Sequence, residues 1–246
     1  MKWNLWSKRI AALAIFPALV ALTLWGQKQT ARVSVTGGSI LQESSTPKWT
    51  VCIDAGHGGI DPGKVGINQA LEKDVNLQIT QKLQKFLEAA DVEVLLTRST
   101  DQGLYDENES NKKVQDMKNR VRKIEEFSPD LVVSIHQNSY HEEYVHGAQV
   151  FYYQTSTDGA DAAAYLQDQL RKTLDPQNNR APKANDSYYL LKKTSAPIVI
   201  AECGFLSNRA EAEKLVDEVY QEKVAWALHL GILRYLNSLH MVSGGL

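Results

Sequence analysis

The stretch Asp130-Leu-Val-Val-Ser-Ile-His136 decides the fold class, because it is an almost continuous apolar run that ends on a polar side chain. The same form recurs in Val51-Cys-Ile-Asp54, which precedes a glycine-rich loop, and in Pro197-Ile-Val-Ile-Ala-Glu202. Strands with so few polar positions are typical of sheets that helices cover on both faces. The three runs therefore predict rigid central strands of an α/β sheet.

Short β-rich segments alternate with helical patterns between residues 49 and 238, which predicts a three-layer αβα domain around a mixed sheet of about six strands. Strands are expected at residues 49–54, 92–97, 131–136, 148–153, 188–191 and 198–202. Apolar residues at helical spacing predict helices at residues 75–87, 114–127, 161–174, 210–216 and 220–236. The polar residues 99–113 predict a loop beside the site that the strand ends form.

The first 26 residues have a composition of their own. Lys2, Lys8 and Arg9 precede an uninterrupted apolar run at residues 10–25. This arrangement is typical of an N-terminal membrane anchor or of a cleaved signal peptide, and either one places the remaining chain outside the cytoplasm. No pair of small residues marks a cleavage site after the run, which favours the anchor.

Two further segments lie outside the expected domain. Residues 27–48 are rich in Ser, Thr and Gly and predict a flexible linker. Residues 239–246 are expected to form a short tail.

Charge and cysteine content narrow the function classes. The 246 residues carry 27 Lys and Arg against 29 Asp and Glu, a formal net charge of −2, and no basic stripe is interleaved with aromatic residues. Nucleic acid is therefore not expected as a partner. The two cysteines, Cys52 and Cys203, lie in or beside expected core strands, so we expect two buried free thiols rather than a disulfide.

Three polar side chains at the ends of these elements form a candidate zinc site. His57 follows the first strand among glycines that let the backbone approach a ligand closely, Glu72 opens the first helix, and His136 ends the third strand. Two imidazoles and one carboxylate hold Zn²⁺ in catalytic sites and leave the fourth tetrahedral position open. Taken singly, each residue also has a plain structural explanation: a glycine turn, a first-turn acid favoured by the helix dipole, and a surface histidine.

A second pair of histidines resembles a metal motif but has the wrong spacing. His141 and His146 are five residues apart, whereas the metalloprotease helix motif places its histidines four apart. On a helix these two rings would diverge by about 140°. We expect both in a loop near the crevice and outside the metal site, and the sequence suggests no partner for His229 or His240.

Six segments occur in a fixed order along the chain: IDAGHGGIDPGKVG, LEKDVNLQIT, VEVLLTRSTD, DLVVSIHQNS, GAQVFYY and IVIAECGFLSN. Together they resemble the zinc-dependent N-acetylmuramoyl-L-alanine amidases, specifically the family-3 catalytic domain of bacterial cell-wall hydrolases. The resemblance spans about residues 49–237. Two departures from the family pattern, Ala55 in place of proline and Cys203 in place of threonine or valine, remove no functional group.

The resemblance implies that His57, Glu72 and His136 hold one zinc ion per chain and that Glu202 is the catalytic carboxylate. The apolar residues that precede Glu202 predict a partly desolvated carboxyl group with a raised pKa. Such a group is suited to take a proton from water and to deliver it to the leaving amine.

Supporting roles fall to four further residues. Asp54 is expected to orient His57 or its loop, since zinc-binding histidines usually need a second hydrogen-bond partner. Asn138 is expected either to bind substrate amides or to shape the loop after the third strand. Arg98 and Arg120 are expected to pair with acidic residues and so to hold the crevice.

The implied reaction is hydrolysis of the amide bond between the lactyl group of N-acetylmuramic acid and L-alanine in peptidoglycan. The single N-terminal apolar segment, the compact size and the ending Gly231-Ile-Leu-Arg-Tyr-Leu236 are most similar to the germination-specific members of the family. That similarity implies a step toward muramic-δ-lactam in the spore cortex, outside the cytoplasm, with the forespore intermembrane space as one location. The expected partners are peptidoglycan, the membrane through the N-terminal segment, and an accessory protein of unknown identity.

Two other functions stay open from the sequence alone. A zinc peptidase that cleaves within peptidoglycan peptides would use the same metal chemistry. A catalytically silent wall-binding module would keep the fold without turnover, although the presence of His57, Glu72, His136 and Glu202 counts against it.

Overall fold

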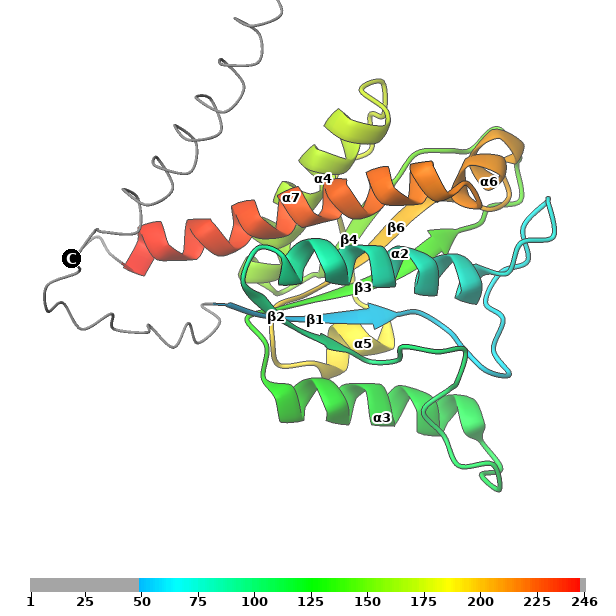
Figure 1. The fold of residues 1–246 in the computed structure, drawn as a ribbon, viewed down its shortest axis with the longest axis horizontal. Helices are drawn as coiled ribbons and strands as arrows, with labels where there is room; N and C mark the ends of the chain where they lie inside the picture. Colours follow the sequence, from blue (N-terminus) through cyan, green and yellow to red (C-terminus); the bar gives the residue numbers. More distant parts are fainter. Residues whose placement is uncertain (1–48, 244–246) are drawn as a thin grey trace, which may run out of the picture. The chain divides into compact units, whose positions relative to one another are not determined.

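The computed structural model describes residues 49–243, which fold around one six-stranded sheet with helices on both faces (Figure 1). The strand order is β2-β1-β3-β6-β4-β5. The strands are β1 (Trp49–Ala55), β2 (Val92–Leu96), β3 (Leu131–Asn138), β4 (Gln149–Tyr153), β5 (Lys183–Asn185) and β6 (Ile198–Phe205). The predicted α/β class, with a six-stranded sheet flanked by helices, is confirmed.

The sheet is mixed. Strands β2, β1, β3 and β6 run parallel to one another, whereas β4 runs antiparallel to β6 and parallel to β5. The three strands predicted to be central, β1, β3 and β6, each have a neighbour on both sides. Because carboxyl ends of parallel strands meet at one edge of a sheet, the polar residues that end these strands are brought to the same edge.

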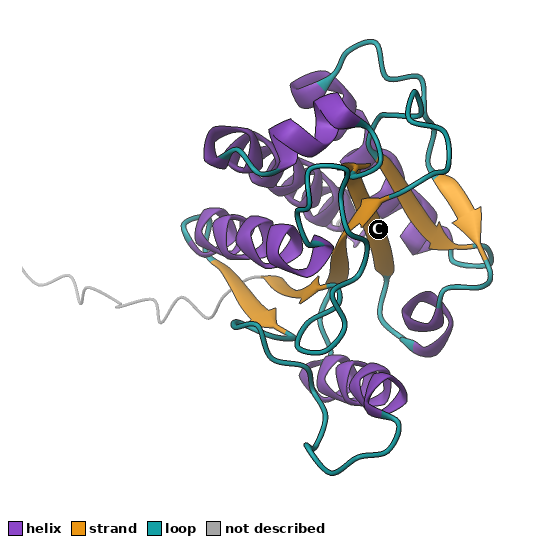
Figure 2. Cartoon of the chain, turned by 90° about the vertical axis from the view of Figure 1, so that its right-hand side faces the viewer, coloured by secondary structure: helices purple, strands orange, loops and turns teal. Residues whose placement is uncertain are grey.

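Two apolar layers cover the sheet (Figures 1 and 2). One layer packs helices α2 (Glu72–Glu88), α4 (Thr157–Leu174) and α7 (Glu218–Ser243) on one face, and α6 (Arg209–Leu215) adds to it. The other face carries α3 (Lys112–Phe127) and α5 (Tyr189–Lys193) over a smaller cluster. In α2, Val75, Ile79, Leu83 and Leu87 recur every four residues and are all buried, and each such side chain contributes about 1.5–3 kcal/mol. The amphipathic face of α2 therefore fixes the position of its first residue, Glu72.

One predicted strand is wrong. Residues 188–191, expected as the fifth strand, instead include the start of the short helix α5, and the remaining strand is β5 at Lys183–Asn185. Leu190 and Leu191 are buried in the smaller apolar cluster, so their burial, not a strand ladder, explains the apolar run. The predicted loop is confirmed, since residues 97–111 form no helix or strand between β2 and α3.

The segments predicted at the chain ends fall largely outside the described residues. The anchor at residues 1–26 and the linker at residues 27–48 lie there entirely. Within residues 49–243, no helix is both long and apolar enough to cross a membrane.

Both cysteines are buried free thiols, as predicted. Cys52 lies on β1 and Cys203 on β6, and neither forms a disulfide. Burial raises the pKa of both thiols far above the ordinary value, and the neighbouring carboxylates, Asp54 for Cys52 and Glu202 for Cys203, raise it further.

Candidate metal centre

The face of the sheet that carries α3 and α5 presents its polar residues in a row at the end of the strands. His136 on β3 is the register partner of Glu202 on β6, and Glu202 is in turn the partner of Gln149 on β4. Residues paired across strands point to the same face of a sheet. His136, Glu202 and Gln149 therefore form one line of neighbouring side chains across three strands.

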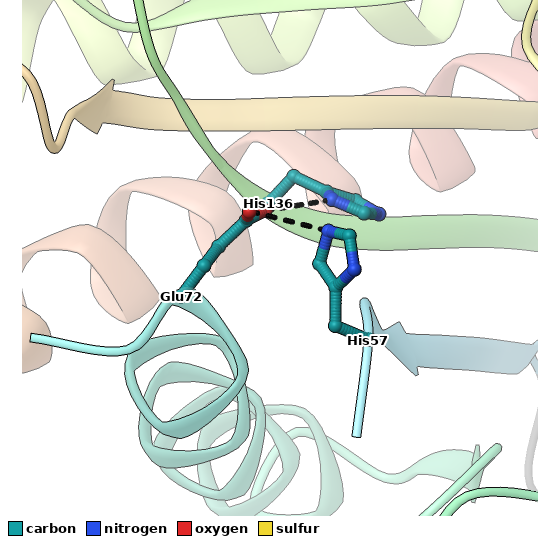
Figure 3. Close-up of side chains that lie close together, drawn as sticks. All are labelled: His57, Glu72 and His136. Atoms are coloured by element: carbon teal, nitrogen blue, oxygen red, sulfur yellow. Dashed lines mark hydrogen bonds and ion pairs between the residues drawn. The ribbon is translucent and has the colours of Figure 1, made fainter. Parts of the chain in front are cut away.

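The three predicted ligands converge beside this line. His57 follows β1, Glu72 is the first residue of α2, and His136 lies near the end of β3. Figure 3 shows the Glu72 carboxylate pointing at both imidazole rings. His57 Nε2 lies 3.2 Å from Glu72 Oε2, and His136 Nδ1 lies 3.0 Å from Glu72 Oε1. One ligand atom from each residue lies within 4.8 Å of the others, so the structure brings the predicted set together.

Glycines allow the close approach of these side chains. A Cβ added at Gly56 would lie 2.3 Å from Cε1 of His136, which is too close for a non-bonded contact. Gly63 has a φ of +68°, and a Cβ there would lie 2.5 Å from Glu72 Oε2 and 2.7 Å from Cδ2 of His57. At Gly56 only glycine leaves enough space, and at Gly63 glycine provides both the space and the positive φ. The glycine-rich loop is thus shaped around the two imidazoles and the carboxylate.

Glu72 is held in one orientation by its neighbours. Lys64 N donates to Oε2 at 2.8 Å, and Gln137 N donates to Oε1 at 3.2 Å. Asn76 Nδ2 lies 3.5 Å from Oε1 and also donates to the Gly56 carbonyl at 3.1 Å. Burial disfavours the charged carboxylate, but the hydrogen bonds and charges of the two histidines outweigh it and hold the pKa of Glu72 well below its usual range. Glu72 is therefore an ionised and oriented candidate ligand.

Asp61 orients His57, and the sequence analysis missed it. His57 Nδ1 lies 2.9 Å from Asp61 Oδ2, and Lys113 Nζ lies 2.9 Å from Asp61 Oδ1. Burial raises the pKa of Asp61, but the hydrogen bonds from His57 and Lys113 lower it by more, so the carboxyl group is ionised. An ionised acceptor at Nδ1 keeps the proton there and leaves Nε2, which faces Glu72, free to bind a cation.

Asp54 does not contact the His57 ring and acts on its loop instead. Asp54 Oδ1 accepts from Arg120 Nη1 at 2.6 Å and from Thr97 Oγ1 at 2.7 Å, and Oδ2 accepts from Ser134 Oγ. Burial opposes ionisation, but Arg120 and the two hydroxyl groups hold the pKa of Asp54 at about 2. Arg120 Nη2 also donates to the His57 carbonyl at 2.6 Å. The buried Asp54–Arg120 pair therefore supports the backbone of the ligand loop.

The two arginines hold the loop in different ways. Arg120 pairs with Asp54 and Asp116, each at 2.6 Å, as predicted. Arg98 forms no salt bridge with an acidic side chain in the described part of the chain; its guanidinium donates instead to the carbonyls of Ala55 at 2.9 Å and Gly56 at 3.0 Å. Together the two guanidinium groups bind three successive carbonyls, from Ala55 to His57, which fixes the path of the loop.

Glu202 is buried and has spare bonding capacity. Its side chain is 7% exposed, and within the described residues its Oε2 atom is buried without a hydrogen-bond partner. Burial raises the pKa of Glu202 to about 7, although His136 and His57 partly oppose the rise. The raised pKa predicted from the apolar strand is confirmed. A carboxyl group poised near neutral pH can accept and return a proton.

A cavity of about 150 Å³ opens beside the centre. His57, His136 and Glu202 line one side of it. Its lining also includes the apolar Met117 from α3 and Leu190 from α5, together with the charged Asp116 and Arg120 of α3. The cavity therefore has both charged and apolar side chains beside the convergent residues.

The remaining predicted residues lie outside the metal group. Asn138 Oδ1 accepts from Ser139 N at 2.8 Å, which shapes the loop after β3. His141 and His146 lie in the exposed loop between β3 and β4, as predicted. His229 lies on α7, where its ring stacks on Trp226 at 5.1 Å. The side chain of His240 lies outside the described part of the chain.

The donor set fits a divalent metal ion. His57, Glu72 and His136 offer two nitrogen atoms and one carboxylate oxygen around a common point, which is the composition of open zinc sites. The buried Oε2 of Glu202 lacks a partner within residues 49–243, and a buried carboxylate oxygen normally has one. A ligand between the metal group and Glu202 would satisfy it.

Comparisons with known proteins agree on one family. A family described as N-acetylmuramoyl-L-alanine amidase matches residues 51–234. The germination-specific N-acetylmuramoyl-L-alanine amidase of Bacillus subtilis is 37% identical over 188 residues, which cover 75% of this chain and 78% of that protein.

Solved structures give the same result. The CwlD amidase from Clostridioides difficile, determined in complex with the GerS lipoprotein, is 42% identical with a TM-score of 0.75, over 77% of this chain and 99% of that chain. The N-acetylmuramoyl-L-alanine amidase AmiC2 of Nostoc punctiforme is 32% identical with a TM-score of 0.67, over 77% of this chain and 97% of that chain.

Proposed function

The chain belongs to the N-acetylmuramoyl-L-alanine amidase family, and on that premise we propose how its residues divide the work of hydrolysis. It is an amidohydrolase of peptidoglycan. The bond it breaks joins the lactyl group of N-acetylmuramic acid to L-alanine. An amide is a poor electrophile and water is a poor nucleophile at neutral pH, so both must be activated.

We propose that His57, Glu72 and His136 hold one zinc ion per chain. The observation that carries this assignment is the convergence of three ligand atoms within 4.8 Å, with Glu202 on the neighbouring strand. When bound, zinc would supply a Lewis acid that activates water and polarises the amide carbonyl. The ionised Glu72 and the Asp61 contact on His57 Nδ1 would keep the three donors ready for the cation.

Glu202 is proposed as the group that moves the proton. Its raised pKa of about 7 lets it take a proton from the attacking water and give it to the amine of L-alanine as the bond breaks. Its place beside His136 and the free Oε2 atom support this role. The apolar side chains that line the cavity, such as Met117 and Leu190, would help to exclude bulk water from the reacting groups.

We further propose that the substrate is spore-cortex peptidoglycan. The support is the similarity to the germination-specific amidase of Bacillus subtilis and to the CwlD amidase. In the cortex this hydrolysis would expose the lactyl carboxyl group that becomes part of muramic-δ-lactam, outside the cytoplasm. Because the CwlD structure is a complex with a lipoprotein, an accessory protein is proposed here as well.

Digestion of purified peptidoglycan, followed by liquid chromatography and mass spectrometry, tests the proposal. An amidase releases stem peptides that begin with L-alanine and leaves muramic acid with a free lactyl carboxyl group. Cleavage that leaves L-alanine on the sugar would instead identify a zinc peptidase. If zinc-containing protein releases no peptide from any peptidoglycan, the chain is a catalytically silent module. A faster reaction on cortex than on vegetative wall would support the cortex assignment, and equal rates would contradict it.

A further inference from the structure

Arg180 lies in the loop between α4 and β5, at the edge of the sheet where the reaction would occur. Its guanidinium stacks over the Phe205 ring with 4.8 Å to the ring centre. Nε donates to the His146 carbonyl at 2.7 Å, and Nη1 donates to Gln149 Oε1 at 3.2 Å. The side chain is half-buried and held on three sides by these contacts.

The contacts place Arg180 beside the line of residues that contains Glu202. Gln149, which accepts from Arg180, is the register partner of Glu202 on the side away from His136. Phe205, under the guanidinium, pairs with Asn138 just beyond the His136–Glu202 pair. Across the end of the sheet, the spatial order is therefore the candidate metal ligand His136, the candidate proton-transfer group Glu202 and then the cation of Arg180.

The charge of Arg180 is not matched by the protein. A guanidinium has five N–H donors, and the two contacts above use two of them. Within the described residues, Arg180 forms no salt bridge with an acidic side chain, and both of its acceptors are neutral amide oxygens. A cation that is oriented, half-buried and without an acidic partner is suited to bind an anionic group on a ligand.

The substrate has such a group on one side only of the bond that breaks. On the sugar side, N-acetylmuramic acid offers hydroxyl groups and a neutral acetamide. On the peptide side, the residue after L-alanine is a glutamate linked through its γ-carboxyl group, and its α-carboxylate is free. The charge of Arg180 therefore matches the peptide side of the bond, where the second stem-peptide residue carries the first free carboxylate.

We propose that Arg180 binds the free α-carboxylate of the second stem-peptide residue and so places the peptide across Glu202. The inference rests on the proposed amidase function and adds the direction in which the substrate lies: sugar toward the metal ligands, peptide toward β4. It also makes the charge of that second residue a determinant of specificity.

Two muropeptides that differ only at this group test the inference. One carries the free α-carboxylate on its second residue, and the other carries the α-amide in its place. Wild-type zinc enzyme is expected to show a kcat/KM about tenfold higher for the carboxylate form, which is the value of one charge-assisted hydrogen bond. The two substrates should differ in KM and have similar kcat values, because the carboxylate is remote from the bond that reacts.

Variants at position 180 assign the preference to the guanidinium. In Arg180→Gln the neutral side chain can still donate to a backbone carbonyl, and the ratio between the two substrates should fall to about one. Arg180→Lys keeps the charge but loses the forked geometry, so it should keep part of the preference. Arg122→Ala, which removes an arginine exposed on α3, is the control and should keep the wild-type ratio.

The outcomes separate the inference from the function on which it rests. A wild-type enzyme that hydrolyses both substrates equally well overturns the inference and leaves the amidase function intact. An Arg180→Gln variant that keeps the tenfold preference overturns it too, provided that its zinc content and thermal unfolding match the wild type. If Arg180→Gln does not fold, the Arg180→Lys ratio decides: a fully retained preference for the carboxylate contradicts binding through the guanidinium fork. A wild-type enzyme that contains zinc and releases no peptide from either substrate removes the proposed function itself.

Discussion

His136 and Glu202 are register partners on the parallel strands β3 and β6, so their side chains lie next to each other on one face of the sheet. The ladder becomes irregular immediately afterwards, between His136 and Asn138. A candidate metal ligand and the candidate proton-transfer group are thus placed by the last regular part of the sheet. Backbone hydrogen bonds between central strands position them more rigidly than loops would.

Replacing the Glu202 carboxylate tests its role in proton transfer. In Glu202→Gln the side chain keeps its shape but can no longer take and return a proton. The rate of peptide release should fall by about 10²–10⁴-fold, whereas zinc content stays the same. Product release by mass spectrometry and zinc by elemental analysis provide the measurement. Glu213→Gln, on the exposed side of α6, is the control, and unchanged hydrolysis in zinc-containing Glu202→Gln would contradict the assignment.

Removal of an imidazole tests the ligand set. The wild type is expected to contain one zinc ion per chain, and His136→Ala should lose it because two donors rarely retain zinc. His141→Ala removes a histidine whose side chain is 72% exposed and should keep full zinc content. Elemental analysis after gel filtration measures both variants. Full zinc occupancy in His136→Ala would exclude His136 as a ligand.

Asp61 should set zinc affinity through His57. In Asp61→Asn the ionised acceptor at His57 Nδ1 becomes a neutral amide, which makes the ring a poorer ligand. Zinc affinity is expected to fall by about 10–100-fold, as measured by competition with a chromophoric chelator. Asp91→Asn is a matched control, because Asp91 is exposed and its φ of +57° is one that asparagine also adopts. Equal affinities for the Asp61 variant and the wild type would disprove the role.

The Asp54–Arg120 pair should make the fold sensitive to acid. The pKa of Asp54 is about 2 in the folded chain against an ordinary value of 3.8, so folding favours the ionised form. This contribution is complete above the ordinary pKa and is lost as the pH falls toward the folded-state value. Urea unfolding of zinc-free protein should therefore show a larger loss of stability between about pH 4 and pH 2 in the wild type than in Asp54→Asn.

The same variant has a second expected effect near neutral pH. There, Asp54→Asn leaves Arg120 with only Asp116 as an acidic partner, and it should lower the free energy of unfolding by about 3 kcal/mol. If the free energy of unfolding falls equally between about pH 4 and pH 2 in the wild type and in Asp54→Asn, Asp54 is not the cause of the acid sensitivity.

The central strands are predictable from the sequence, whereas the edge of the sheet is not. Strands β1 and β6 and the first half of β3 consist mostly of apolar residues because both of their faces are buried. Residues 188–191 are also apolar, but a run of four fits a buried strand and a buried helical turn equally well. β5 has two exposed residues of three and pairs only with β4, so nothing in its own sequence distinguishes it from a loop.

The candidate ligands are predictable for a similar reason. His57, Glu72 and His136 each stand at the end of a recognisable element, and the ends of neighbouring elements meet at the crevice. Asp61 could not be placed in this way. Its contact with His57 depends on a loop that turns back on itself through a left-handed His57, with a φ of +63°. An aspartate four residues after a histidine among glycines is the local signal that could have suggested it.

The two buried thiols give the folded protein a practical property. Cys52 and Cys203 are at most 1% exposed, and their raised pKa values keep both of them protonated at neutral pH. Alkylating reagents attack the thiolate, so the native chain should remain unlabelled while the unfolded chain reacts twice. The extent of thiol labelling therefore measures the fraction of unfolded chains. A cysteine introduced on the surface would be a single attachment point for a fluorophore, without removal of either native cysteine.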